Sequence, residues 1–223
     1  MEFTSRSYVP AAGKDWLLPL YDPVQWLLGG DAARRELIER AAIQPAQRML
    51  EIGCGTGSLV VQLKQMHPDA DVVGLDPDPR GLARARRKAA RAGVDIAFDE
   101  CFADALPYPD ASFDRVFSSF MFHHLERAVK EKTLREVRRV LKASGSLHLL
   151  DFGGPTARDR GLIARLLHAS EPLADNFENR IPKMMEEAGL ARPHEVSHRG
   201  TLFGRIAYYQ AGASAAPGPS GIS

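Results

Sequence analysis

The sequence predicts an α/β fold in which a mostly parallel sheet carries helices on both faces. Two observations support this prediction. Short apolar segments alternate along most of the chain with segments of helical periodicity, which is typical of parallel sheets with crossover helices. Two late strand patterns are separated by only a short glycine turn, and such a link can join only antiparallel strands.

Length and composition are those of one globular unit. The chain has 223 residues, of which 44% are hydrophobic and 26% charged, and its net charge is +1. A balanced charge indicates neither a nucleic-acid partner nor a membrane surface. Cys54 and Cys101 have no disulfide or metal-site spacing, so we expect reduced thiols, no metal and a cytoplasmic protein. No signal peptide and no membrane span are expected.

The first half of the chain supplies most of the alternation. Residues 1–30 are rich in aromatic residues, prolines and leucines, and form an arm that is either a lid or a satellite core. Asp31 is the expected N-cap of a helix over about 32–42. The elements expected next are a strand over 48–52, a helix over 58–66, a strand over 71–75, a helix over 79–92 between Pro79 and Gly93, and a weak strand over 96–100.

The second half departs from strict alternation near its end. The expected elements are strands over 113–119 and 146–151, helices over 127–141, 158–168 and 179–188, and a strand pair over 194–200 and 201–211. Residues 212–223 are small, uncharged and rich in proline, glycine and serine, so we expect a disordered tail.

A glycine-rich segment, MLEIGCGTGSL at 49–59, directly follows the first strand. The dinucleotide fingerprint requires G-x-G-x-x-G, but Ser58 stands where its third glycine belongs. Asp76 closes the second strand, where an acid can accept hydrogen bonds from ribose hydroxyls. These residues predict a cofactor that contains ribose. They leave a nicotinamide-dependent oxidoreductase as an alternative.

Four motifs in order resemble the class I S-adenosylmethionine-dependent methyltransferases. They are LEIGCGTGSL, GLDPDPRGLARARRKA, ADALPYPDASFDRVFSSFMFHHL and LKASGSLHLLDF. Within that family the chain is most similar to the small-molecule group that includes the ubiquinone/menaquinone C-methyltransferases. The resemblance covers about 34–211. It implies a Rossmann-like three-layer αβα sandwich over 31–211, whose seven-stranded, mostly parallel sheet has an antiparallel last strand.

The resemblance also implies that S-adenosylmethionine is the cofactor, and it assigns residues to the methionine moiety. Glu51 would hold the amino group, directly or through water. Gly53, Gly55 and Gly57 would let the backbone pass close beneath the methionine moiety and the ribose. Ser119 would lie near the methionine moiety at the end of its strand. A structural role as a loop cap stays open for Glu51.

Further residues are assigned to the adenosine moiety by the same resemblance. Asp76 would accept hydrogen bonds from the ribose hydroxyls, and Pro77 would pack on the adenine face. Asp104 would accept from the adenine amine, while the backbone N–H of Ala105 would face a ring nitrogen. Asp76 as a helix N-cap and Asp104 as a turn residue are the structural alternatives.

Catalytic residues are expected at the end of the strand over 113–119. Methyl transfer is an in-line displacement that mainly requires alignment and exclusion of water. If the acceptor must lose a proton, His123 or His124 is the candidate base, and Asp151 ends the next strand on the same side. Capping or packing roles are the alternatives for all three.

The acceptor is expected to be a small molecule that is methylated at carbon, oxygen or nitrogen. The helix over 79–92 carries several arginines and no acid, which is compatible with an RNA-binding stripe. Its apolar positions, however, fall on one face, so the arginines occupy the solvated side and nucleic acid is not the expected substrate. A non-catalytic methyltransferase-like binding protein is the second alternative function.

Overall fold

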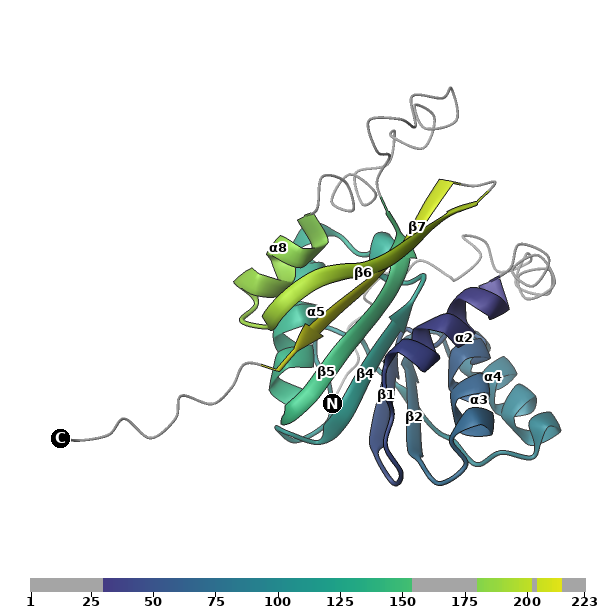
Figure 1. The fold of residues 1–223 in the computed structure, drawn as a ribbon. Coiled ribbons are helices and arrows are strands. Elements are labelled where there is room, and N and C mark those ends of the chain that lie inside the picture. Colours follow the sequence, from purple (N-terminus) through teal and green to yellow (C-terminus); the bar gives the residue numbers. More distant parts are fainter. Residues whose placement is uncertain (1–29, 154–179, 202–203, 214–223) are drawn as a thin grey trace.

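A seven-stranded sheet divides the molecule into two layers of helices (Figure 1). The computed structural model describes residues 30–153, 180–201 and 204–213. In sheet order, the strands are β3 (Ala97–Glu100), β2 (Asp71–Asp76), β1 (Arg48–Ile52), β4 (Phe113–Ser119), β5 (Leu141–Phe152), β7 (Gly204–Gly212) and β6 (Ala191–Thr201).

The strand directions agree with the predicted fold. Strands β3, β2, β1, β4 and β5 pair in parallel, and β7 pairs antiparallel with both β5 and β6. The last strand is therefore inserted between β5 and β6, as the family resemblance implies. Because chain order reverses between β1 and β4, this sheet has its topological switch point between these two strands, where ligands bind in open α/β sheets.

The helices cover both faces of the sheet (Figure 1). On one side lie α2 (Gly30–Arg40), α3 (Ser58–Met66) and α4 (Pro79–Ala92), and on the other lie α5 (Arg127–Val140) and α8 (Arg180–Glu187). Successive side chains of β1 point to opposite faces of the sheet and pack into a separate hydrophobic core on each face. Leu50 and Ile52 pack with residues of α5 and α8, whereas Met49 packs with residues of α2, α3 and α4.

Several element boundaries differ from the sequence prediction. Helix α2 begins at Gly30, so Asp31 lies inside its first turn and is not the N-cap; its carboxylate accepts a hydrogen bond from Arg34. Strand β5 begins at Leu141 rather than Ser146, directly after α5, because the pairing with β4 continues past a register shift. Strand β7 extends to Gly212, which the sequence assigned to the tail.

Other predictions concern segments that lie outside the described residues. These are the N-terminal arm up to residue 29, the helix over 158–168 and the tail from residue 214. The helix expected over 179–188 is described as α8 and ends before Gly189, as predicted. Within the described part of the chain, no helix is long and apolar enough to cross a membrane.

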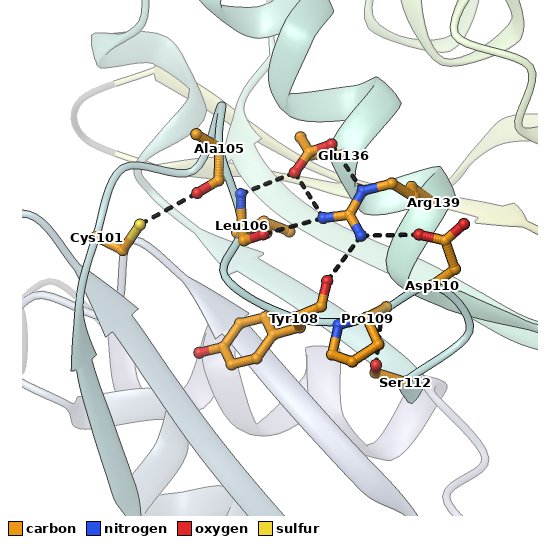
Figure 2. A network of polar contacts seen from close by, with 9 residues as sticks. All are labelled: Cys101, Ala105, Leu106, Tyr108, Pro109, Asp110, Ser112, Glu136 and Arg139. Carbon is orange, nitrogen blue, oxygen red and sulfur yellow. Dashed lines mark hydrogen bonds and ion pairs between the residues drawn. The ribbon is translucent and has the colours of Figure 1, made fainter. Parts of the chain in front are cut away.

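Arg139 anchors the loop between β3 and β4 to helix α5 (Figure 2). Its guanidinium donates to the carbonyl oxygens of Leu106 at 3.0 Å and Tyr108 at 2.7 Å, and to Asp110 at 2.9 Å. Glu136 accepts from the same guanidinium and from the backbone N–H of Leu106. Together these two side chains of α5 fix a loop that has no regular structure of its own.

Replacement of Arg139 by methionine is expected to destabilise the fold by about 1–3 kcal/mol, because loop carbonyls and Glu136 lose their charged donor. Urea unfolding followed by circular dichroism measures this change. Arg135→Met is the matched control, because Arg135 is exposed on the same helix and forms no ion pair within the described residues. Equal stability of the two variants would contradict the anchoring role.

Candidate active site

A cavity of about 410 Å³ opens at the carboxyl ends of β1, β2 and β4. This is the switch point of the sheet, and it receives side chains from strands and helices on both sides of it. Most of the residues that the sequence assigned to the cofactor line it: Glu51, Gly53, Gly55, Asp76, Pro77, Asp104 and Ser119. His124 also lines it, whereas Gly57, Ala105 and His123 do not belong to its described lining.

The glycine turn after β1 is built from left-handed backbone. Gly53 and Gly57 have φ angles of 68° and 78°, which side chains rarely adopt. A Cβ atom on Gly53 would lie 2.2 Å from Cγ of Met121, at the cavity wall. A Cβ on Gly57 would lie 2.8 Å from Cβ of Ala85 on α4. The lack of a side chain at Gly53 therefore leaves room for Met121 at the cavity wall, while the lack of one at Gly57 allows α3 and α4 to pack close to each other.

Asp76 connects the end of β2 to the glycine turn. One carboxylate oxygen accepts from the backbone N–H of Gly55 at 2.8 Å, and the other accepts from that of Asp78 at 2.8 Å. The N-cap of α4 is Asp78, whose side chain accepts from the backbone N–H of Arg80. Burial raises the pKa of Asp76 to about 6, although the two backbone donors oppose this shift.

Glu51 is the most deeply placed acid of the cavity. Its side chain is buried at the end of β1, and Oε1 accepts from the Ser119 hydroxyl at 2.8 Å. Oε2 is buried without a well-formed hydrogen bond in the described part of the structure. Burial raises the pKa of Glu51 to about 7, and the Ser119 hydroxyl and the charge of Arg34 only partly offset it. A ligand that brings a cationic donor would satisfy this oxygen.

The loop after β3 forms another wall of the cavity. Phe102 and Asp104 from this loop line the cavity together with Pro77 from the end of β2. Ala105 is exposed, and its backbone N–H donates to the carbonyl oxygen of Phe102 at 3.2 Å. In this structure the Ala105 amide therefore makes a turn bond within the loop.

A histidine and an aspartate form a close pair beside the cavity. Nδ1 of His123 lies 2.6 Å from Oδ1 of Asp151, and the His123 backbone N–H donates to Oδ2 at 2.9 Å. Asp151 is fully buried at the end of β5, and its two contacts with His123 hold the imidazole in a fixed orientation. The His124 ring lies 4.0 Å from that of His123 between centroids. Burial, together with the neighbouring His123, lowers the pKa of His124 to about 4.

The sequence prediction missed several residues of the cavity. Leu125 and Val129 supply apolar wall, and their positions after β4 carry no pattern that identifies them. Phe120 and Met121 also line the cavity, and they follow directly on the strand end where the sequence places the ligand. Arg34 supplies a buried cation from α2. A signal for Arg34 existed, because it occupies a position on the otherwise apolar stripe of that helix.

The cavity fits the cofactor that the motifs imply. The buried, unsatisfied Oε2 of Glu51 suits an ammonium group, and the glycine turn leaves room for close backbone approach. Carboxylates at Asp76 and Asp104 offer acceptors for hydroxyl and amine donors. Apolar side chains next to these acceptors suit the flat faces of a base.

Comparisons with known proteins agree with this geometry. Residues 49–145 match the family described as "Methyltransferase domain". A demethylmenaquinone methyltransferase from Thermus thermophilus is 40% identical over 153 residues, which are 67% of this chain and 69% of that protein. A ubiquinone/menaquinone biosynthesis C-methyltransferase from Xanthomonas campestris is 32% identical over 187 residues, or 73% of each chain.

A solved structure supports the fold independently. The crystal structure of an S-adenosylmethionine-dependent methyltransferase from Aquifex aeolicus superposes with a TM-score of 0.64 at 20% identity. The superposition covers 81% of this chain and 89% of the Aquifex aeolicus chain. The identity with the Thermus enzyme and the length over which it extends establish the relationship. The chain therefore belongs to the class I S-adenosylmethionine-dependent methyltransferases, close to the group of the ubiquinone and menaquinone C-methyltransferases.

Proposed function

We propose that this methyltransferase acts on a small aromatic acceptor of the hydroquinone type and methylates a ring carbon next to a hydroxyl group. The observation that carries the proposal is the His123–Asp151 pair beside the cofactor cavity, since a hydroxyl must lose its proton before the ring becomes nucleophilic. The names of the relatives support the same acceptor class, because both are quinone methyltransferases. Methylation at oxygen is the competing outcome.

Residues of the cavity would hold the cofactor by its polar groups. Glu51 would bind the ammonium group, Asp76 the ribose hydroxyls and Asp104 the adenine amine, with Pro77 against the base. Ser119 would keep the Glu51 carboxylate in place through its hydroxyl. When bound, S-adenosylmethionine supplies an activated methyl group, so the protein has to align the acceptor and manage its proton.

The base in this mechanism is His123. With Nδ1–H directed at the Asp151 carboxylate, Nε2 carries the lone pair that takes a proton. The acceptor hydroxyl would give its proton to Nε2, which would make the adjacent ring carbon nucleophilic. That carbon would take the methyl group that S-adenosylmethionine supplies, with the carbon–sulfur bond breaking as the carbon–carbon bond forms and S-adenosylhomocysteine as the leaving group. The ring carbon would then release its own hydrogen to solvent as a proton, and Nε2 would return its proton to the acceptor oxygen of the aromatic product. Asp151 orients the imidazole through its contacts with Nδ1 and the His123 backbone N–H.

His124 has a different part in the proposal. Its lowered pKa, about 4, keeps the ring neutral at the cavity wall near neutral pH. A neutral wall places no positive charge against a cationic methyl donor. We also propose a chain organisation of an N-terminal arm, a catalytic domain and a C-terminal tail, and a cytoplasmic location. The predicted bounds of 1–30, 31–211 and 212–223 change in that Gly30 and Gly212 belong to the domain, because they lie in α2 and β7.

The acceptor proposal is tested with a panel of reduced, demethylated quinones, phenols and amines, with S-adenosylhomocysteine release and product mass as readouts. We expect turnover with hydroquinones and a product with the methyl group on carbon. His123→Gln should lower kcat by about 10²–10⁴-fold without weakening S-adenosylhomocysteine binding, and its rate should rise with pH as the hydroxyl ionises unaided. His194→Gln on exposed β6 is the control. Unchanged kcat in His123→Gln would exclude this base.

Replacement of Asp76 by asparagine is expected to weaken S-adenosylhomocysteine binding at least about tenfold, because one charged acceptor for the ribose is lost. Isothermal titration calorimetry measures the affinity. Asp71→Asn is the matched control, because Asp71 lies exposed at the opposite end of the same strand. Retention of full affinity by Asp76→Asn would remove the ribose assignment.

Cofactor binding should release a proton at Glu51. The carboxyl group has a pKa of about 7 in the structure, so it is largely protonated at pH 6, and a bound ammonium group favours its ionised form. Binding of S-adenosylhomocysteine at pH 6 should therefore release about one proton, and affinity should rise as the pH rises toward 7. Asp76, with a pKa of about 6, contributes in the same direction.

Calorimetry in buffers of different ionisation enthalpy counts the released protons. Glu51→Gln should remove most of the release, whereas Glu100→Gln, exposed at the end of β3, should leave it unchanged. Proton uptake on binding to the wild-type protein would contradict the placement of the ammonium group beside Glu51.

A further inference from the structure

Arg34 is an arginine in an apolar position. The buried stripe of α2 consists of Gly30, Ala33, Arg34, Leu37 and Ile38, so a charged residue interrupts a face that packs on the sheet. Its side chain is 4% exposed, yet it lines the cavity. Burial of a guanidinium is costly unless a specific partner compensates it, so this position requires an explanation.

The described structure satisfies only part of this guanidinium. Nη1 donates to Asp31 at 3.3 Å, and this is the one hydrogen bond of the Arg34 side chain within the described residues. The guanidinium carbon lies 5.5 Å from the centre of the Phe120 ring, which supports one face of the group. A guanidinium has five N–H donors in a planar fork, so donors remain for a ligand in the cavity.

Charge in the cavity is distributed unevenly. Its described lining contains a single arginine or lysine, Arg34, against five acids: Glu51, Asp76, Asp78, Asp104 and Glu126. Arg34 is also close enough to Glu51 to lower the pKa of that carboxyl. The cavity lining therefore includes one buried cation, Arg34, and one buried acid, Glu51, whose charges attract each other.

The amino-acid end of the cofactor carries the complementary pair of charges, an ammonium group and a carboxylate. We propose that Arg34 binds the carboxylate of the methionine moiety while Glu51 binds its ammonium group, an inference that rests on the function proposed above. Arginine matches a carboxylate with two parallel N–H···O bonds, which fixes the orientation of that moiety as well as its charge. The contact with Asp31 holds the fork in place from the helix side.

Three ligands separate this role from a structural one. S-adenosylhomocysteine carries both charges, its decarboxylated analogue carries only the ammonium group, and 5′-methylthioadenosine carries neither. Wild-type protein should bind S-adenosylhomocysteine more tightly than the decarboxylated analogue. Arg34→Met should bind S-adenosylhomocysteine about 10- to 100-fold more weakly, while its affinity for the other two ligands changes little, so the preference for the carboxylate disappears. Arg34→Lys should restore part of that preference.

Arg35→Met is the matched control, because Arg35 is the next residue of α2, is 67% exposed and pairs with Glu39. It should retain wild-type affinity for all three ligands. Equal losses for the three ligands in Arg34→Met, or no loss at all, would overturn the carboxylate assignment while leaving the cofactor assignment standing. If the wild-type protein binds neither S-adenosylhomocysteine nor 5′-methylthioadenosine, the proposed function is overturned, and this inference with it.

Discussion

The site depends on the burial of two carboxylates, Glu51 and Asp76, at the ends of adjacent parallel strands. Burial raises the pKa of both groups, so each is held in a place where its charged form is costly until donors arrive. Asp76 receives two backbone donors from the turns that it joins, and this fixes the path of the glycine turn. Glu51 accepts one hydrogen bond from a hydroxyl, and its other oxygen has no well-formed hydrogen bond among the described residues. Asp76 therefore fixes the glycine turn, whereas Glu51 can still accept a hydrogen bond from a bound ligand.

One wall of the cavity, the loop after β3, is held by a side chain of helix α5. The loop after β3 contributes Asp104, but neighbouring carbonyls of that loop are fixed by Arg139 from α5 (Figure 2). This arrangement separates two tasks. The loop that carries Asp104 is held by a guanidinium that is not part of the cavity lining. The irregular loop that carries Asp104 is thus positioned by the regular helix α5.

Much of this organisation is readable from the sequence because it has short-range causes. Alternating strand and helix patterns, Gly93 and Gly189 after helices, and three glycines at alternate positions each report local backbone requirements. The start of α2 and the full length of β5 were not predicted, because the first depends on a buried stripe and the second on pairing with a distant strand. The pairing of His123 with Asp151 joins residues 28 positions apart, and no local pattern encodes it.

The end of β4 links the residues proposed to hold the cofactor to those proposed to act on the acceptor. Ser119 points to Glu51, and the next residue, Phe120, has a left-handed φ of 54° that is uncommon for an aromatic residue. Its backbone N–H is nonetheless bonded to Leu150 of β5, so the turn is held by the sheet. This reversal sends the chain into the short helix η2 (Phe122–His124), where His123 meets Asp151 at the end of β5. The left-handed backbone at Phe120 therefore lets one short stretch of chain place Ser119 beside Glu51 and His123 beside Asp151.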